Sequence, residues 1–122
     1  MFDSCENLLY PPSILPATTL TINCYEKMFV NCEKMLYAPI LPAENLRNSC
    51  YSYMFQSCKD IRRYEVNFTN WLSVQDNNKR CCTDWIAGGR NHSDVDFICP
   101  SALDTTQKDN NHVLQYWNII KK

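Results

Sequence analysis

The chain has 122 residues, a formal net charge of −1 and 45% apolar residues. This length is enough for one compact domain with a buried core. The charge argues against direct binding to nucleic acid, which needs an excess of basic residues. The opening MFDSCENLL does not resemble a signal peptide, and no run approaches the roughly 20 apolar residues of a membrane span. We therefore expect no membrane insertion and a cytoplasmic location, with the extracellular surface as the alternative.

A nine-residue motif occurs twice, as CYEKMFVNC at residues 24–32 and as CYSYMFQSC at 50–58. Three units align when the count starts at Met1: MFDSCENLLYPPSILPATTLTINCYEK, MFVNCEKMLYAPILPAENLRNSCYSY and the opening of a third, MFQSCKDIRRYEV. One such unit cannot bury its own apolar face, so neighbouring units must stack. The repeat predicts a solenoid over residues 1–66.

Equivalent residues of stacked units are expected to meet in columns. The columns are Met1, Met28 and Met54; Phe2, Phe29 and Phe55; Cys5, Cys32 and Cys58; Cys24 and Cys50; and Leu8, Met35 and Ile61. Cysteine is small and is often buried, so we interpret these cysteines as buried thiols. Disulfides within a unit, between Cys24 and Cys32 or between Cys50 and Cys58, are the alternative.

The pattern inside each unit predicts an α/β architecture. Apolar residues recur at helical spacing in residues 18–29 and 44–55. The short runs 8–10, 35–37 and 61–64 have the character of strands, and together they predict a small parallel sheet with helical segments on its other side.

Residues 67–122 diverge from the repeat, and we expect them to form a C-terminal cap of the same single domain, residues 1–122. Strands are predicted at 95–98 and 113–120, and three tryptophans supply bulk for covering the open end: Trp71, Trp85 and Trp117. The N-terminal end has no separate cap, which makes it a candidate interface with a partner or with a second copy in a homodimer.

The spaced pattern MFxxCxxLxxAPxLPAxxLxxxCYxxMFxxC resembles the leucine-rich-repeat variant of BspA-like type found in Bacteroides-type bacteria and their phages. The resemblance covers residues 1 to about 61 and is weaker in the cap. It implies a short leucine-rich-repeat-like solenoid of parallel strands and short helices. It also implies an adhesive or partner-binding role and no reaction.

Two positions of each unit depart from the family pattern, which has small polar residues there. They hold Leu9 and Tyr10, Leu36 and Tyr37, and Arg62 and Arg63. Stacked side by side, they predict an apolar and aromatic stripe that ends in two arginines, with Tyr64 next to it. Exposed tyrosine and arginine often anchor protein interfaces, so these side chains are candidate partner-binding residues. The alternative is that Leu9 and Leu36 turn inward and widen the core.

A second candidate binding cluster contains basic residues near the two adjacent glycines: Lys79, Arg80 and Arg90, with His92. Such residues can grip carboxylates on a partner. Solvated loop charges are the alternative.

No motif for catalysis or for a cofactor is present. Cys81, Cys82, His92 and Cys99 are metal-ligand types, but they lack the paired spacing of zinc sites. The sequence also lacks a phosphate loop, a nucleophile elbow and a dinucleotide fingerprint. We therefore expect no catalytic residue, no metal, no cofactor and no enzymatic activity.

These patterns favour a non-enzymatic protein-binding module. The first hypothesis is a small phage or mobile-element protein in the host bacterial cytoplasm. It would bind and inhibit a bacterial protein or ribonucleoprotein such as a defence nuclease, in the manner of an anti-CRISPR protein. The alternative is a cell-surface or phage-tail adhesion module that recognises host protein or glycan.

Overall fold

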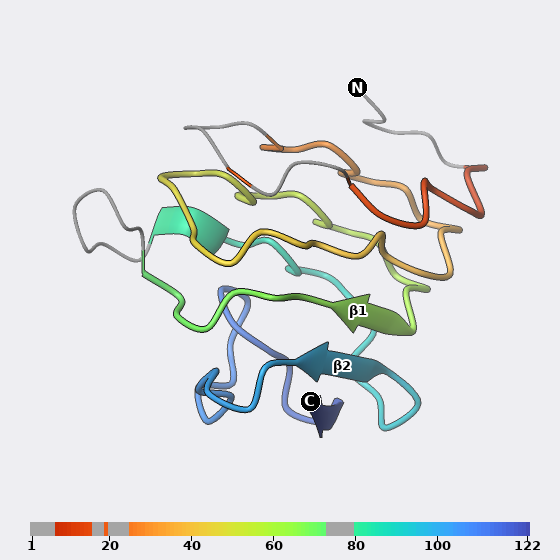
Figure 1. Ribbon diagram of the computed structural model, residues 1–122. Helices are drawn as coiled ribbons and strands as arrows, with labels where there is room; N and C mark the ends of the chain where they lie inside the picture. Colours follow the sequence, from red (N-terminus) through yellow and green to blue (C-terminus); the bar gives the residue numbers. More distant parts are fainter. Residues whose placement is uncertain (1–6, 16–18, 20–24, 73–79) are drawn as a thin grey trace.

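The computed structural model describes residues 7–15, 19, 25–72 and 80–122. Its regular elements, labelled in part in Figure 1, are the strands β1 (Arg63–Glu65), β2 (Asp96–Cys99) and β3 (Asn118–Lys121) and the 3-10 helix η1 (Arg80–Cys82). The strands form a parallel sheet in the order β1-β2-β3. The predicted strands at 61–64, 95–98 and 113–120 overlap these three.

The expected strands at 8–10 and 35–37 do not form, but backbone hydrogen bonds join these runs: the Leu36 amide donates to the Leu9 carbonyl over 3.2 Å, and the Arg62 amide donates to the Leu36 carbonyl over 2.8 Å. Further along, Ile14 pairs with Ile40, and Leu41 pairs with Val66, both as single parallel bridges. In Figure 1, residues 7–15 (red) and β3 (dark blue) lie at opposite ends of the stacked segments.

Side chains along these paired segments alternate between the core and the surface, as the two-residue period of extended chain requires. The inward positions are buried: Leu15, Leu41, Val66 and Cys99. The neighbouring positions form an outward row, and in register they are Ile14, Ile40, Glu65, Ile98 and Ile120. We call this set the isoleucine row.

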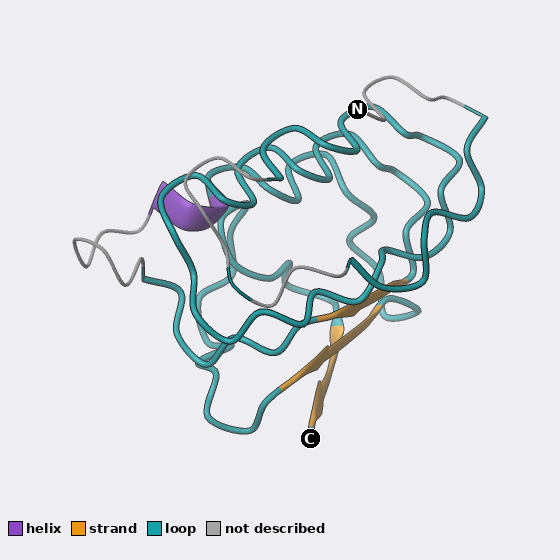
Figure 2. Ribbon diagram, turned by 45° about the horizontal axis from the view of Figure 1, so that its top comes forward, coloured by secondary structure: helices purple, strands orange, loops and turns teal. Residues whose placement is uncertain are grey.

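A second side of the molecule consists of repeated turns, and Figure 2 shows most of its chain as loops. In residues 25–32, the amides at 28, 30 and 32 each donate to the carbonyl three residues earlier, and the same three bonds recur in 51–58 and in 82–89. These nine distances are 3.0–3.3 Å. Residues 82–89 therefore share the backbone pattern of the two motif segments, although their sequence does not show the motif.

Regular hydrogen bonds also join these turn segments to one another. Alternate amides from 25 to 31 donate to carbonyls from 50 to 56, and amides from 51 to 57 donate to carbonyls from 81 to 87, over 2.7–3.1 Å. This ladder satisfies the backbone groups that a helix would otherwise pair internally.

The helix predicted for residues 44–55 is wrong, and half of the one predicted for 18–29 lies outside the described residues. The backbone has positive φ at Lys27, Asn31, Ser49, Tyr53 and Ser57. Left-handed residues at four-residue intervals end each turn before a helix can form. Such turns also place apolar residues three or four apart, which is why the spacing resembles that of a helix.

The described part of the core contains the predicted stack of Phe29 on Phe55, whose rings lie 5.7 Å apart. The rings of Tyr25 and Tyr51, one motif position over and not among the predicted columns, stack in the same way at 6.2 Å. All three tryptophans of the predicted cap are buried: Trp71, Trp85 and Trp117. Met1, Phe2, Cys5 and Cys24 lie outside the described residues, as does the proposed N-terminal interface.

Six cysteines of the described ranges are buried: Cys32, Cys50, Cys58, Cys81, Cys82 and Cys99. The Cys58 thiol is free and lies 3.0 Å from the carbonyl oxygen of Phe29, to which it donates. The alternative disulfide between Cys50 and Cys58 is therefore not formed.

Candidate functional site

A hollow of about 290 Å³ opens on the outer side of the first three paired segments. Six of its eight lining residues are apolar or aromatic, and Ser13 and Arg63 complete the set. We call it the tyrosine hollow; its lining is Tyr10, Pro11, Pro12, Ser13, Tyr37, Ala38, Ile40 and Arg63.

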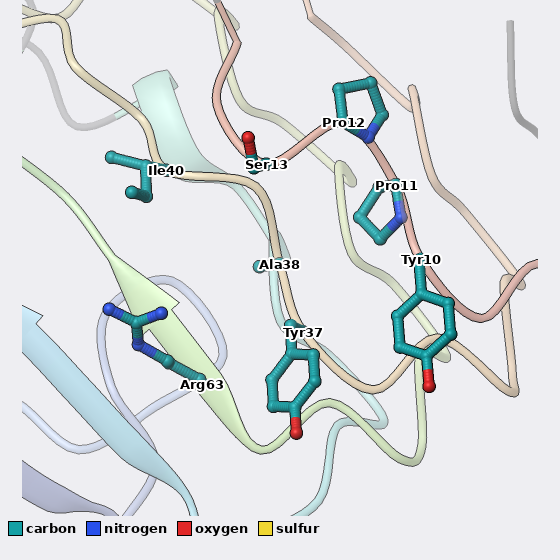
Figure 3. A pocket seen from close by; sticks show the side chains of 8 residues that line it. All are labelled: Tyr10, Pro11, Pro12, Ser13, Tyr37, Ala38, Ile40 and Arg63. Atoms are coloured by element: carbon teal, nitrogen blue, oxygen red, sulfur yellow. The ribbon is translucent and has the colours of Figure 1, made fainter.

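Figure 3 shows that the lining comes from three successive segments of the chain. Tyr10 and Tyr37 project to the same side of their segments, and Arg63 projects from β1. The small side chain of Ala38 lies between larger neighbours, which leaves room for an incoming group. The prolines fix the local backbone, because the pyrrolidine ring locks φ.

The sequence correctly predicted three residues of this hollow as exposed. Tyr10 is 67% exposed and Tyr37 is 49% exposed, although both rings are large and amphipathic. The Arg63 side chain is also 49% exposed. An exposed aromatic pair beside an arginine makes this hollow a candidate contact surface.

Two cations beside the hollow contact one carboxylate. The Glu65 carboxylate lies 2.9 Å from Nη2 of Arg63 and 3.6 Å from Nζ of Lys122. The Arg63 side chain nevertheless remains half exposed, so its guanidinium is accessible to a carboxylate on a partner.

The isoleucine row continues the apolar surface from the hollow toward the C-terminus. Ile14 is 48% exposed and Ile120 is 38% exposed, while Ile40 and Ile98 between them are half-buried. Glu65 lies at the centre of the row, where its carboxylate pairs with Arg63 and Lys122. The result is a largely apolar row with one acidic group.

The other residues of the predicted stripe differ in position. Leu9 is 43% exposed and Arg62 is exposed, whereas Leu36 is half-buried. The alternative in which both leucines turn into the core therefore does not hold for Leu9. None of these three lines the hollow.

Tyr64 is the clear correction to the predicted stripe, because its side chain is only 1% exposed. It follows Arg63 in β1, so the alternation of the strand turns it inward. Its ring stacks on Trp117 at 4.6 Å and meets the edge of Phe55 at 5.5 Å. Tyr64 is a core residue and cannot contact a partner.

The second predicted cluster is only partly described. Lys79 lies outside the described residues, and Arg80 is placed as the first residue of η1. The Arg90 guanidinium is held by Asp94 through two contacts of 2.8 Å. This ion pair lowers the pKa of Asp94 to about 2, so both groups are charged at neutral pH. Arg90 thus stabilises its own loop, which fits the alternative of a loop charge.

The residues that the sequence missed are the walls of the hollow and the isoleucine row. Pro11 and Pro12 precede the Ile14 bridge, and Ala38 and Ile40 hold the equivalent places one unit later. The alignment of the first two units already contained this signal, since Pro11 aligns with Ala38 and Ile14 with Ile40.

Within the described ranges, no group of three or more histidine, cysteine, aspartate or glutamate side chains could hold a metal ion. No helix in the same ranges is long and apolar enough to cross a bilayer. The chemistry that the hollow offers is noncovalent: apolar contact, phenol hydrogen bonds and one guanidinium.

No protein-family model matches the chain, and no curated protein or solved structure matches it.

Proposed function

We propose that this chain is a non-enzymatic protein-binding module that uses the tyrosine hollow and the isoleucine row as its contact surface. One observation carries the proposal: Tyr10, Tyr37 and Arg63, from three successive units, line a single apolar hollow. Tyrosine and arginine are enriched at the centres of protein interfaces, and an apolar pocket suits an anchoring side chain.

The architecture that we propose for this module is a short leucine-rich-repeat-like solenoid with a C-terminal cap. The ring stacking of Phe29 on Phe55 and the backbone ladder between turn segments support it. Stacking of this kind presents equivalent surface residues side by side, which is how a solenoid makes an extended binding face.

The partner that we propose is a bacterial protein or ribonucleoprotein. The role as a small phage or mobile-element inhibitor, for example of a defence nuclease, rests on the sequence pattern and its resemblance. The adhesion alternative is favoured by oxidised cysteines, and the free thiol of Cys58 argues against one of the two disulfides it invokes.

Capture from a reduced lysate of a Bacteroides-type bacterium tests the proposal. Tagged wild-type protein should retain a specific partner, and Tyr37→Ala and Arg63→Glu should each weaken its binding about tenfold or more. Tyr116→Ala is the matched control, because Tyr116 is 61% exposed and does not line the hollow.

The outcome against the proposal is equally specific. If Tyr37→Ala and Arg63→Glu recover the partner as well as Tyr116→Ala does, the tyrosine hollow is not the contact surface. Circular dichroism of each variant checks that the fold is retained.

A further inference from the structure

A second hollow, of about 330 Å³, lies in the C-terminal half of the chain. It is formed by residues 69–72 and by parts of 102–112, which are distant in sequence. Its lining is polar where that of the tyrosine hollow is apolar. The residues that matter to its chemistry are Thr69, Asn70, Trp71, Asp104, Gln107 and His112.

His112 is the anchor of this second hollow. It is 5% exposed, and its Nδ1 lies 2.6 Å from Oδ1 of Asp109. The carboxylate at Nδ1 orients the ring, so that Nε2 is the ring nitrogen left to meet a ligand. Among the described residues, Nε2 has no hydrogen-bond partner. A buried imidazole is thus held in one orientation at the wall of a cavity.

A hydrogen bond joins Trp71 to the backbone of Asp104. The indole Nε1 of Trp71 donates to the carbonyl oxygen of Asp104 over 2.7 Å, and the indole ring meets His112 edge to face at 5.0 Å. The Asp104 carboxylate uses Oδ1 to accept from the amide and the hydroxyl of Thr106, at 2.9 and 2.6 Å. Its other oxygen, Oδ2, has no partner among the described residues.

The remaining groups add donors beside these acceptors. Asn70 accepts from the Leu72 amide through Oδ1, at 3.0 Å, so its NH₂ group is left as a donor.

Hydrogen bonds from Thr106 lower the pKa of Asp104, so that its carboxylate is ionised at neutral pH. Lys121 is the nearby cation, and its ammonium donates to the Leu103 carbonyl. Lys121 does not line the hollow, whereas the Asp104 carboxylate does.

We propose that this second hollow is a binding site for a neutral saccharide. Each sugar hydroxyl both donates and accepts, which matches Nε2 of His112 and the acceptor Asp104 set beside a donor at Asn70. The negative charge of Asp104 in the lining disfavours an anionic ligand. The volume lies at the lower end of the roughly 300–1,000 Å³ of small-molecule sites, which suits one or two sugar rings. The site is separate from the protein-binding face.

Nuclear magnetic resonance titration of the isotope-labelled chain tests this site. The probes are the methyl glycosides of glucose, galactose, mannose and N-acetylglucosamine, with glucuronic acid as the charged comparison. At least one neutral glycoside should shift the Trp71 indole N–H signal and the amide signals of residues 104–112, and glucuronic acid should bind more weakly.

Two variants localise the effect. Asp104→Asn retains the oxygen that accepts from Thr106 but loses the carboxylate, and it should weaken saccharide binding about tenfold or more. Gln107→Ala is the second variant, since it removes a half-buried lining side chain without touching the Asp109–His112 pair. Asp60→Asn is the control, because Asp60 lines neither hollow.

Three outcomes overturn the site: no neutral glycoside shifts these signals, glucuronic acid binds as tightly as the best neutral sugar, or Asp104→Asn and Gln107→Ala both bind like Asp60→Asn. The titration contains no protein partner, so a negative result would not contradict the proposal that the tyrosine hollow binds a protein. In the same way, a negative capture experiment would not contradict the proposal of a saccharide site.

Discussion

Phe29 and Phe55 form a parallel stack, with their ring centroids 5.7 Å apart and their planes within 3° of parallel. Both side chains are fully buried. They hold the same position in successive repeat units, and the amide of Phe29 donates to the carbonyl of Met54. Side-chain stacking and backbone pairing therefore use the same register.

Replacing Phe55 tests how much of the stability this column carries. Its ring contacts Phe29, Tyr64 and Trp85, so Phe55→Ala should leave a cavity and lower the free energy of unfolding by about 3–5 kcal/mol. Urea denaturation measures the change. Tyr116→Ala, at an exposed site, should change it by no more than about 0.5 kcal/mol. Equal effects of the two variants would contradict the stacked column.

The columns could be predicted from the sequence because equivalent positions of successive repeat units carry the same residue type. The unit at 82–89 could not, because Trp85, Ile86 and Gly89 stand where the motif has methionine, phenylalanine and cysteine. Its turn bonds, and not its residue types, make it equivalent. Gly88, with φ of +75°, takes the left-handed position that Ser57 holds one segment earlier.

The two candidate sites also differ in how much of them could be predicted from the sequence. The exposure of Tyr10 and Tyr37 followed from the departures within the repeat, and the two-residue period of a strand that exposes Arg63 would already have turned Tyr64 inward. The second hollow had no sequence signal, because it brings Trp71 to Asp104, 33 residues later in the chain. Contacts of that range depend on how the cap folds.

The left-handed residues of the turn segments give a second prediction. Asn31 is exposed and has φ of 60°. Asn31→Gly should leave stability unchanged or raise it by up to about 1 kcal/mol, because glycine adopts this φ without a steric cost. Asn31→Val should lower it by about 1–2 kcal/mol, since a β-branched residue is strained there.

Glu44→Gly supplies the matched control for this comparison. Glu44 is exposed as well but has no positive φ, so glycine there should destabilise by the usual entropic cost. Thermal or urea unfolding of the three variants measures the effects. If Asn31→Gly destabilises as much as Glu44→Gly, the turn geometry at residue 31 is wrong.

Tyr64 gives a third prediction, which runs opposite to the usual effect of a core substitution. Its hydroxyl is buried and makes no hydrogen bond with any described residue. Burial of an unpaired hydroxyl is unfavourable, so Tyr64→Phe should raise the free energy of unfolding by about 1 kcal/mol. Tyr64→Leu keeps an apolar side chain but loses the stack on Trp117, and it should destabilise. A destabilising Tyr64→Phe would mean that the hydroxyl has a partner.

The buried thiol of Cys58 makes the stability of the folded state depend on pH. Burial raises the pKa of its thiol from 9.0 to about 12, although the neighbouring backbone of Cys32 opposes this change with a hydrogen bond. The folded state therefore keeps the proton after the unfolded state has lost it. The stability that this thiol contributes should be fully present below pH 9 and should decline as the pH rises from there toward 12.

Alkylation followed by peptide mass spectrometry measures the same property directly. The thiolate is the reactive form, so native Cys58 should resist iodoacetamide at pH 8 and react once guanidinium unfolds the chain. Ser93→Cys introduces an exposed thiol in the same molecule as an internal reference. If Cys58 in the native protein reacts as fast as this reference, the thiol is not buried against the Phe29 carbonyl, and the packing of the two units at this column is different from the one described.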